Sequence, residues 1–179
     1  MTNPDPKVVA ALRAALAEFD RKSPSPLSEA AKAHDRKADY QDALIALAAD
    51  GDPAVSSGAT WLIRNGLEEG GALARPRVNA LVKNLPAISQ WDAQLHVAQT
   101  IRLLDLNTTQ ANAVADWLLP LLAHKRPFLR AWSLDAICHL ARKHENLKKQ
   151  AEHALAAAHQ DGAASVRARA RNLQPVSDD

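Results

Sequence analysis

A short pattern of apolar and small residues recurs along the chain and constrains its fold more than any other feature. The clearest copy lies in the run RPFLRAWSLDAICHLARKH, where Leu129, Ser133 and Ile137 follow one another at intervals of four. Residues spaced in this way lie on one face of a helix. Weaker copies are Val55–Ala59–Ile63, Leu95–Gln99–Leu103 and Val166–Ala170, the last with Leu173 in third place.

The spacing between the copies indicates how the helices are organised. Counted from Val55, Leu95, Leu129 and Val166, successive copies are separated by 40, 34 and 37 residues. These separations are typical of stacked two-helix repeats and too long for leucine-rich units. The composition agrees, because aromatic residues make up only 4% of the 179 residues and good helix formers dominate the periodic stretches. The sequence therefore predicts an all-α fold.

Prolines, glycines and capping residues divide the chain into helices. Asp52 is placed to cap a helix that has Pro53 in its first turn, and Asn107 with Gln110 forms a variant capping box. A long helical stretch is expected to reach Ala49. Further helices are expected over Pro76–Leu85, Trp91–Leu104, Asn107 to about Ala123, from Pro127 onward, Asn146–Gln160 and Ser165–Leu173.

These boundaries predict a single domain over residues 1–179. A capping helix is expected at 4–21, with Val8, Leu12 and Leu16 on its apolar stripe. The prolines and serines of KSPSPL predict a loop at 22–28, and the repeats follow over 29–173. The acidic tail 174–179 is expected to be disordered.

The repeats resemble the HEAT and armadillo-like helical repeat family. The resemblance rests on Leu129-Arg130 followed by Ser133, on Val166-Arg167 followed by Ala170, and on Pro120 inside a helical run. It covers roughly Asp39 to Leu173, although Val55-Ser56 and Leu95-His96 lack the arginine. It implies a short right-handed α-solenoid of about four helical hairpins. Such domains serve as protein scaffolds and transport receptors and, in one branch, as DNA alkylation-repair glycosylases.

Charge is spread unevenly along the chain. The net charge is +2, but residues 124–171 hold ten Lys and Arg against four Asp and Glu. A basic surface of this kind attracts phosphates, so nucleic acid stays an alternative partner. We favour a solvated end of the stack, with Arg167, Arg169 and Arg171 as its polar cover.

The four tryptophans, one to each of four helices, predict buried aromatic packing between repeats. A second interpretation comes from the resemblance to the repair branch, in which aromatics and an aspartate hold a damaged nucleoside. Trp91-Asp92 is one such pair. Trp132 and Asp135 lie one turn apart on a helix, and together with Arg130, Arg142 and Lys143 they form the candidate binding surface.

Other chemistry finds little support in the residues. The seven histidines form no paired metal-ligand motif, and the single cysteine, Cys138, excludes an intramolecular disulfide and has no base at a defined spacing. We therefore expect no catalytic residue, cofactor or metal. Low cysteine usage and the absence of a membrane-length apolar run or leader-like segment predict a cytoplasmic protein. The predicted function is a non-catalytic module that binds a protein, as a peptide or a helix; the sequence leaves the oligomeric state open.

Overall fold

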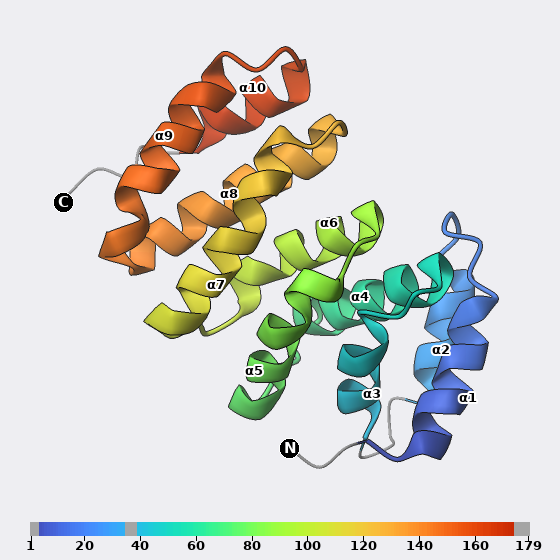
Figure 1. Cartoon of the computed structure of the whole chain (residues 1–179). Helices are drawn as coiled ribbons and strands as arrows, with labels where there is room; N and C mark the ends of the chain where they lie inside the picture. The colour runs from blue at the N-terminus through green and yellow to red at the C-terminus, as the bar shows by residue number, and fades with distance from the viewer. Residues whose placement is uncertain (1–3, 35–38, 174–179) are drawn as a thin grey trace. The chain divides into compact units, whose positions relative to one another are not determined.

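The fold is all-α, as predicted. The computed structural model describes residues 4–34 and 39–173, and within them the chain forms ten α-helices and four short 3₁₀ helices (Figure 1). The helices divide into two compact units, residues 1–104 and 105–179, which are described separately below. The predictions of a single domain and of a disordered tail at 174–179 stay predictions, and the tail lies outside the described residues.

Unit 1 contains six α-helices in two sets. They are α1 (Pro6–Ala17), α2 (Ser25–His34), α3 (Tyr40–Leu47), α4 (Pro53–Glu68), α5 (Arg75–Asn84) and α6 (Trp91–Thr100), with 3₁₀ helices Leu85–Ala87 and Ile101–Leu103. Helices α1, α3 and α5 contact one another in that order, and α2, α4 and α6 do likewise. Contacts between α1 and α2 and between α3 and α4 join the two sets.

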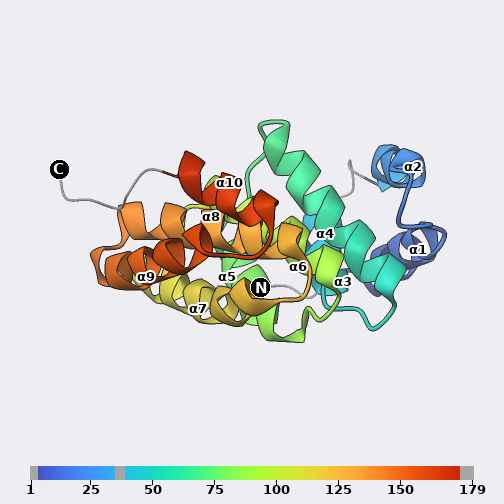
Figure 2. The ribbon, with the colours of Figure 1, turned by 90° about the horizontal axis from the view of Figure 1, so that it is seen from above.

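The start of unit 1 differs from the prediction, because a second helix begins inside the expected loop 22–28. The first helix ends at Ala17, and α2 begins at Ser25 and packs beside α1 (Figure 2). Pro26 lies in the first turn of α2, where the missing N–H costs no hydrogen bond. The prediction of one long helix to Ala49 is also wrong in part, because this stretch forms two helices, α2 and α3. Residues 35–38, between the two helices, lie outside the described residues.

A glycine allows this first helical pair to approach α4 closely. A Cβ atom at Gly58 would lie 3.0 Å from a methyl group of Leu27 and 3.1 Å from one of Leu16. Both leucines are fully buried. The capping helix of the prediction is therefore one half of a helical pair that packs on α4.

Two predicted helix starts are confirmed in atomic detail. The Asp52 carboxylate accepts a hydrogen bond from the Ala54 N–H at 2.9 Å, and Pro53 is the first residue of α4. The Asn107 side chain accepts from the Gln110 N–H, while the Gln110 side chain accepts from the Asn107 N–H. Each cap satisfies backbone donors that lack an intrahelical partner.

Unit 2 is built around one long helix. It contains α7 (Thr108–Leu118), the 3₁₀ helix η3 (Leu119–Ala123), α8 (Pro127–Lys143), the 3₁₀ helix Glu145–Leu147, α9 (Lys148–His159) and α10 (Ala164–Asn172). Helix α8 contacts α7, η3, α9 and α10, and α9 and α10 lie along it in both ribbon views. The predicted helix from Asn107 tightens into η3 because Pro120 cannot donate the backbone hydrogen bond that an α-helix needs.

Most positions of the repeated pattern are buried. Leu129 and Ser133 have no exposed surface and Ile137 is 1% exposed, while Val55, Ala59 and Ile63 are also buried. Val166 and Ala170 are buried as well. The loose copy fails at its third position, because Leu103 lies in a 3₁₀ turn and is 38% exposed.

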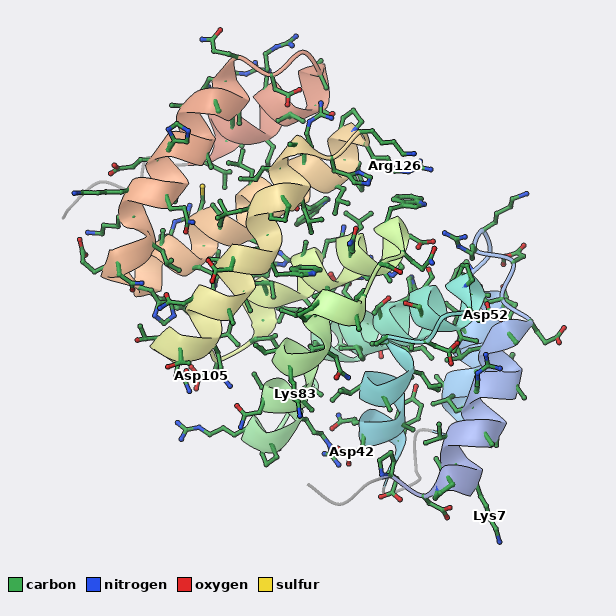
Figure 3. The ribbon with its side chains drawn as sticks, viewed as in Figure 1. Lys7, Asp42, Asp52, Lys83, Asp105 and Arg126 are labelled. Atoms are coloured by element: carbon green, nitrogen blue, oxygen red, sulfur yellow. The ribbon has the colours of Figure 1, made fainter. Side chains whose placement is uncertain are left out.

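Polar side chains connect positions about one repeat apart within each unit. In Figure 3, Asp42 lies on the side of α3 that faces α5, where its carboxylate accepts two hydrogen bonds from Arg77. These two residues are 35 positions apart in the chain. Comparable pairs are Arg64–Gln99 and Thr60–His96 in unit 1, and Asn146–Asn112, Arg130–Asp161 and Arg169–Asp135 in unit 2. Their separations of 31 to 36 residues lie close to the predicted repeat length.

Among the described residues, no helix is long and apolar enough to cross a membrane.

Candidate functional site

The five residues of the predicted binding surface all lie on α8 but do not form one surface. Arg130 is near the start of the helix, and Arg142 and Lys143 are at its end. At a rise of 1.5 Å per residue, Arg130 and Lys143 are about 20 Å apart along the helix axis. Trp132 and Asp135 lie between Arg130 and Arg142 in the helix, and both contact α10.

Arg130 is held in a two-point ion pair. Its Nε and Nη2 donate to the two carboxylate oxygens of Asp161 at 2.9 and 2.8 Å, and its Nη1 donates to the carbonyl of His124 at 2.8 Å. Both side chains of the pair are 17% exposed. The Arg130 guanidinium and the Ala163 N–H hold the pKa of Asp161 below its ordinary value. Arg130 therefore joins α8 to the loop before α10.

Trp132 and Asp135 are brought together as predicted, but by an arginine of α10. The Arg169 guanidinium lies 4.2 Å from the centre of the Trp132 ring, and its Nη1 donates to Asp135 at 3.1 Å. Phe128 meets the same indole edge to face, with ring centres 6.5 Å apart. The carboxylate and the indole face thus already have a cationic partner.

The sequence interpretation misassigned two arginines of α10. Arg169 was expected on a polar outer cover, yet it packs against α8. Arg167 is partly buried, and its Nη1 donates to the Asp161 carbonyl at 2.6 Å. Only Arg171 is exposed as expected. The spacing of 34 residues between Asp135 and Arg169 is the signal that would have paired them.

Arg142 and Lys143 are exposed in the last turn of α8. They are the two residues of the predicted surface that solvent reaches readily.

Unit 2 has a groove on its surface. Its volume is about 580 Å³, within the range of small-molecule and peptide sites. Its walls are η3 and α9, with Leu134 of α8 and Val166 of α10 between them. Most of its lining is apolar: Leu119, Leu122, Ala123, Leu134, Ala154, Ala157, Ala158 and Val166.

The groove also has polar lining residues. The Arg130–Asp161 ion pair contributes to its lining, and Lys149, Gln150 and His153 contribute from α9. Arg130 and Asp161 neutralise each other, which leaves Lys149 as the net charge. The groove is thus a mostly apolar surface whose lining carries a net positive charge.

The groove was not predicted from the sequence, although two signals were present. Pro120 replaces the end of α7 by the narrower η3, and α9 is rich in alanine from Ala154 to Ala158. Small side chains on one wall and a 3₁₀ turn on the other leave space between them. Neither signal specifies a groove until the two elements are known to lie opposite each other.

The tryptophans are less buried than predicted. Trp61, Trp91, Trp117 and Trp132 are all partly exposed. Trp61 and Trp91 line a second cavity, in unit 1, together with Asp92.

Nucleophilic chemistry at Cys138 finds no support in its surroundings. The thiol is buried, and burial raises its pKa to about 11. It is therefore a neutral thiol at neutral pH. Within residues 4–34 and 39–173, no group of three or more histidine, cysteine or acidic residues is placed to hold a metal ion.

Comparisons with family models, with curated proteins and with solved structures find no match for this chain.

Proposed function

We propose that the chain is a short HEAT-like α-solenoid that acts as a non-catalytic interaction module, and that the groove on unit 2 binds an amphipathic helix of a partner protein. The observation that carries the proposal is the mostly apolar groove between η3 and α9, with Lys149 among its lining residues. The ion pairs and hydrogen bonds between positions 31 to 36 residues apart support the solenoid.

The chemistry of the groove selects its occupant. An apolar surface between two helical walls suits the apolar face of a third helix, which needs no backbone partner. Because Lys149 supplies the net charge of the lining, acidic residues beside the apolar face of the partner gain attraction and basic ones lose it. The proposed occupant is therefore an acidic amphipathic helix.

The nucleic-acid alternative takes second place for a specific reason. A repair-type mechanism at Trp132 and Asp135 needs an accessible indole face and a carboxylate that can stabilise a cation. Arg169 already lies over that face and pairs with that carboxylate. The exposed cations Arg142 and Lys143 still offer a site for phosphate.

A displayed helix library tests the proposal. The library carries helices of about 15 residues, long enough to be helical when bound, with leucines on one face and random residues elsewhere. Selection against the purified protein should enrich helices with Asp or Glu beside the leucines. Synthetic copies are then measured by fluorescence anisotropy.

Two neighbouring alanines of α9 provide a matched pair of variants. Ala157 is exposed and lines the groove, whereas Ala156 is exposed outside it. Ala157→Glu should weaken the selected helix by roughly tenfold or more, because it places a like charge on an apolar surface. Ala156→Glu adds the same charge on the same helix and should have little effect. Failure to enrich any helix, or equal binding by the two variants, contradicts the proposal.

A further inference from the structure

The second cavity lies wholly within unit 1 and has a different chemical character from the groove. Its volume is about 260 Å³, room for a ligand of one or two rings rather than a helix. Three segments build it: the loop between α1 and α2, the middle of α4 and the start of α6. Its aromatic lining residues are Phe19, Trp61 and Trp91.

Arg21, in the loop between α1 and α2, lines this cavity and has an unfavourable backbone conformation. Arg21 has a φ of 58°, and it is the one non-glycine residue with positive φ in the described part of the chain. Its guanidinium contacts Asp92 on α6, with Nε at 2.8 Å and Nη2 at 2.6 Å. Residues other than glycine rarely adopt a positive φ unless the surrounding structure imposes it. Residues with such strained backbone conformations concentrate at ligand sites.

His96 gives the cavity a hydrogen-bond acceptor. Its Nδ1 lies 3.2 Å from the Thr60 hydroxyl oxygen, which itself lies 2.9 and 3.0 Å from the carbonyl oxygens of Ser56 and Ser57. Because the single hydroxyl proton of Thr60 goes to these carbonyls, Thr60 accepts from Nδ1–H. Nε2 then carries the lone pair.

The imidazole stays neutral at neutral pH. Burial, helped by the charge of Arg64, lowers the pKa of His96 to about 4. The backbone of Ser57 also forms a hydrogen bond with the His96 ring, and His96 is one of the residues that line the cavity. A ligand bound in the cavity can donate a hydrogen bond to the lone pair of Nε2.

The charged residues at the cavity indicate whether a ligand should be anionic or cationic. Asp92 is committed to Arg21, and its other oxygen accepts from the Ala93 N–H at 3.0 Å. A cationic ligand therefore finds no carboxylate without a partner. Lys22 also lines the cavity and is exposed, so the net charge of the lining is positive.

We propose that this cavity binds a small aromatic carboxylate that carries an N–H or O–H donor on its ring. The ring packs among Trp61, Trp91 and Phe19, the ring donor bonds to Nε2 of His96, and the carboxylate pairs with Lys22. The site is independent of the helix groove, which lies in the other unit.

Three related probes test each contact separately in ¹⁵N spectra of the full chain. Indole-3-acetate carries both the ring donor and the charge; 1-methylindole-3-acetate lacks the donor, and indole-3-acetamide lacks the charge. Indole-3-acetate should give saturable shifts at residues of the cavity. Each analogue should bind roughly tenfold more weakly, the effect expected when one such contact is lost.

Two variants assign these losses to residues. His96→Asn keeps an N–H for Thr60 but lacks the Nε2 acceptor, so it should bind indole-3-acetate and its methyl analogue equally. Lys22→Gln should bind the acid and the amide equally. Lys7→Gln is the matched control, because Lys7 is an exposed lysine of unit 1 that points away from the helices (Figure 3).

The proposal is overturned if indole-3-acetate causes no saturable shifts, if the shifts lie outside the cavity, or if all three probes bind alike. The probe series with the unaltered protein decides the matter even if His96→Asn fails to fold.

Discussion

Replacing Ser133 by alanine should stabilise unit 2. Ser133 has no exposed surface, and its hydroxyl has no hydrogen-bond partner among the described residues. A buried polar group without a partner costs about 1 to 3 kcal/mol. Alanine also has a somewhat higher helix propensity than serine. We expect Ser133→Ala to raise the free energy of unfolding by about 1 to 2 kcal/mol.

A large residue at the same position should have the opposite effect. Ser133→Glu places additional atoms and a charge among Leu129, Ile137 and their neighbours, which are buried. Overpacking and an unpaired polar group together should cost on the order of 2 to 4 kcal/mol. The two substitutions thus differ in sign at one position.

Urea denaturation followed by tryptophan fluorescence measures both effects. Unit 2 contains Trp117 and Trp132, so a background with Trp61→Phe and Trp91→Phe restricts the signal to that unit. Ser165→Ala, at an exposed position of α10, controls for helix propensity alone. A Ser133→Ala protein no more stable than its parent would refute the unpaired hydroxyl. A Ser133→Glu protein that unfolds like its parent would refute the helix register.

Four further expectations concern the Asp135–Arg169 pair, alkylated DNA, the arginines of α10 and His96. Asp135→Asn and Arg169→Gln should each lower the free energy of unfolding by about 1 kcal/mol, and in the same urea assay the double variant should lose less than the sum of the two single losses. The purified protein should release no base from alkylated duplex DNA, and a release that depends on Asp135 would contradict the non-catalytic function. Changing both Arg167 and Arg171 to Gln should leave duplex binding and its salt dependence unchanged in a fluorescence titration, and loss of micromolar affinity would instead indicate a phosphate surface. The folded-state pKa of His96 is about 4 against an ordinary 6.5, so the unfolded chain binds more protons between these values. Stability should therefore fall as pH drops through this window, by about 3 kcal/mol in total, and His96→Asn should flatten the dependence measured by urea denaturation at several pH values.

Local signals in the sequence were sufficient to predict much of the fold. The caps at Asp52 and Asn107 depend on residues within three positions of the helix start, and the buried face of α8 depends on the spacing of Leu129, Ser133 and Ile137. The error at α2 has the same origin. Proline is common both in loops and in the first turn of a helix, so Pro26 alone does not show which of the two structures the segment forms.

The candidate sites could not be predicted in the same way, because they depend on contacts between distant segments. Trp132 and Asp135 formed a plausible site until Arg169, 34 residues after Asp135, was found against them. The cavity of unit 1 needs Arg21 to reach Asp92 across 71 positions. Spacing within one helix carries no information on such pairs. The repeat length indicates the Asp135–Arg169 pair, 34 positions apart, but not the Arg21–Asp92 pair.

Mapping the bound helix on unit 2 tests the central claim most directly. The ¹⁵N-labelled protein is titrated with a selected acidic amphipathic helix and, separately, with duplex DNA. We expect the helix to shift the amides of η3 and α9 around Leu122 and Ala157, and we expect these shifts to be lost in Ala157→Glu. Shifts that cluster instead at Arg142 and Lys143, with duplex DNA producing the same pattern at physiological salt, would contradict a helix-binding groove.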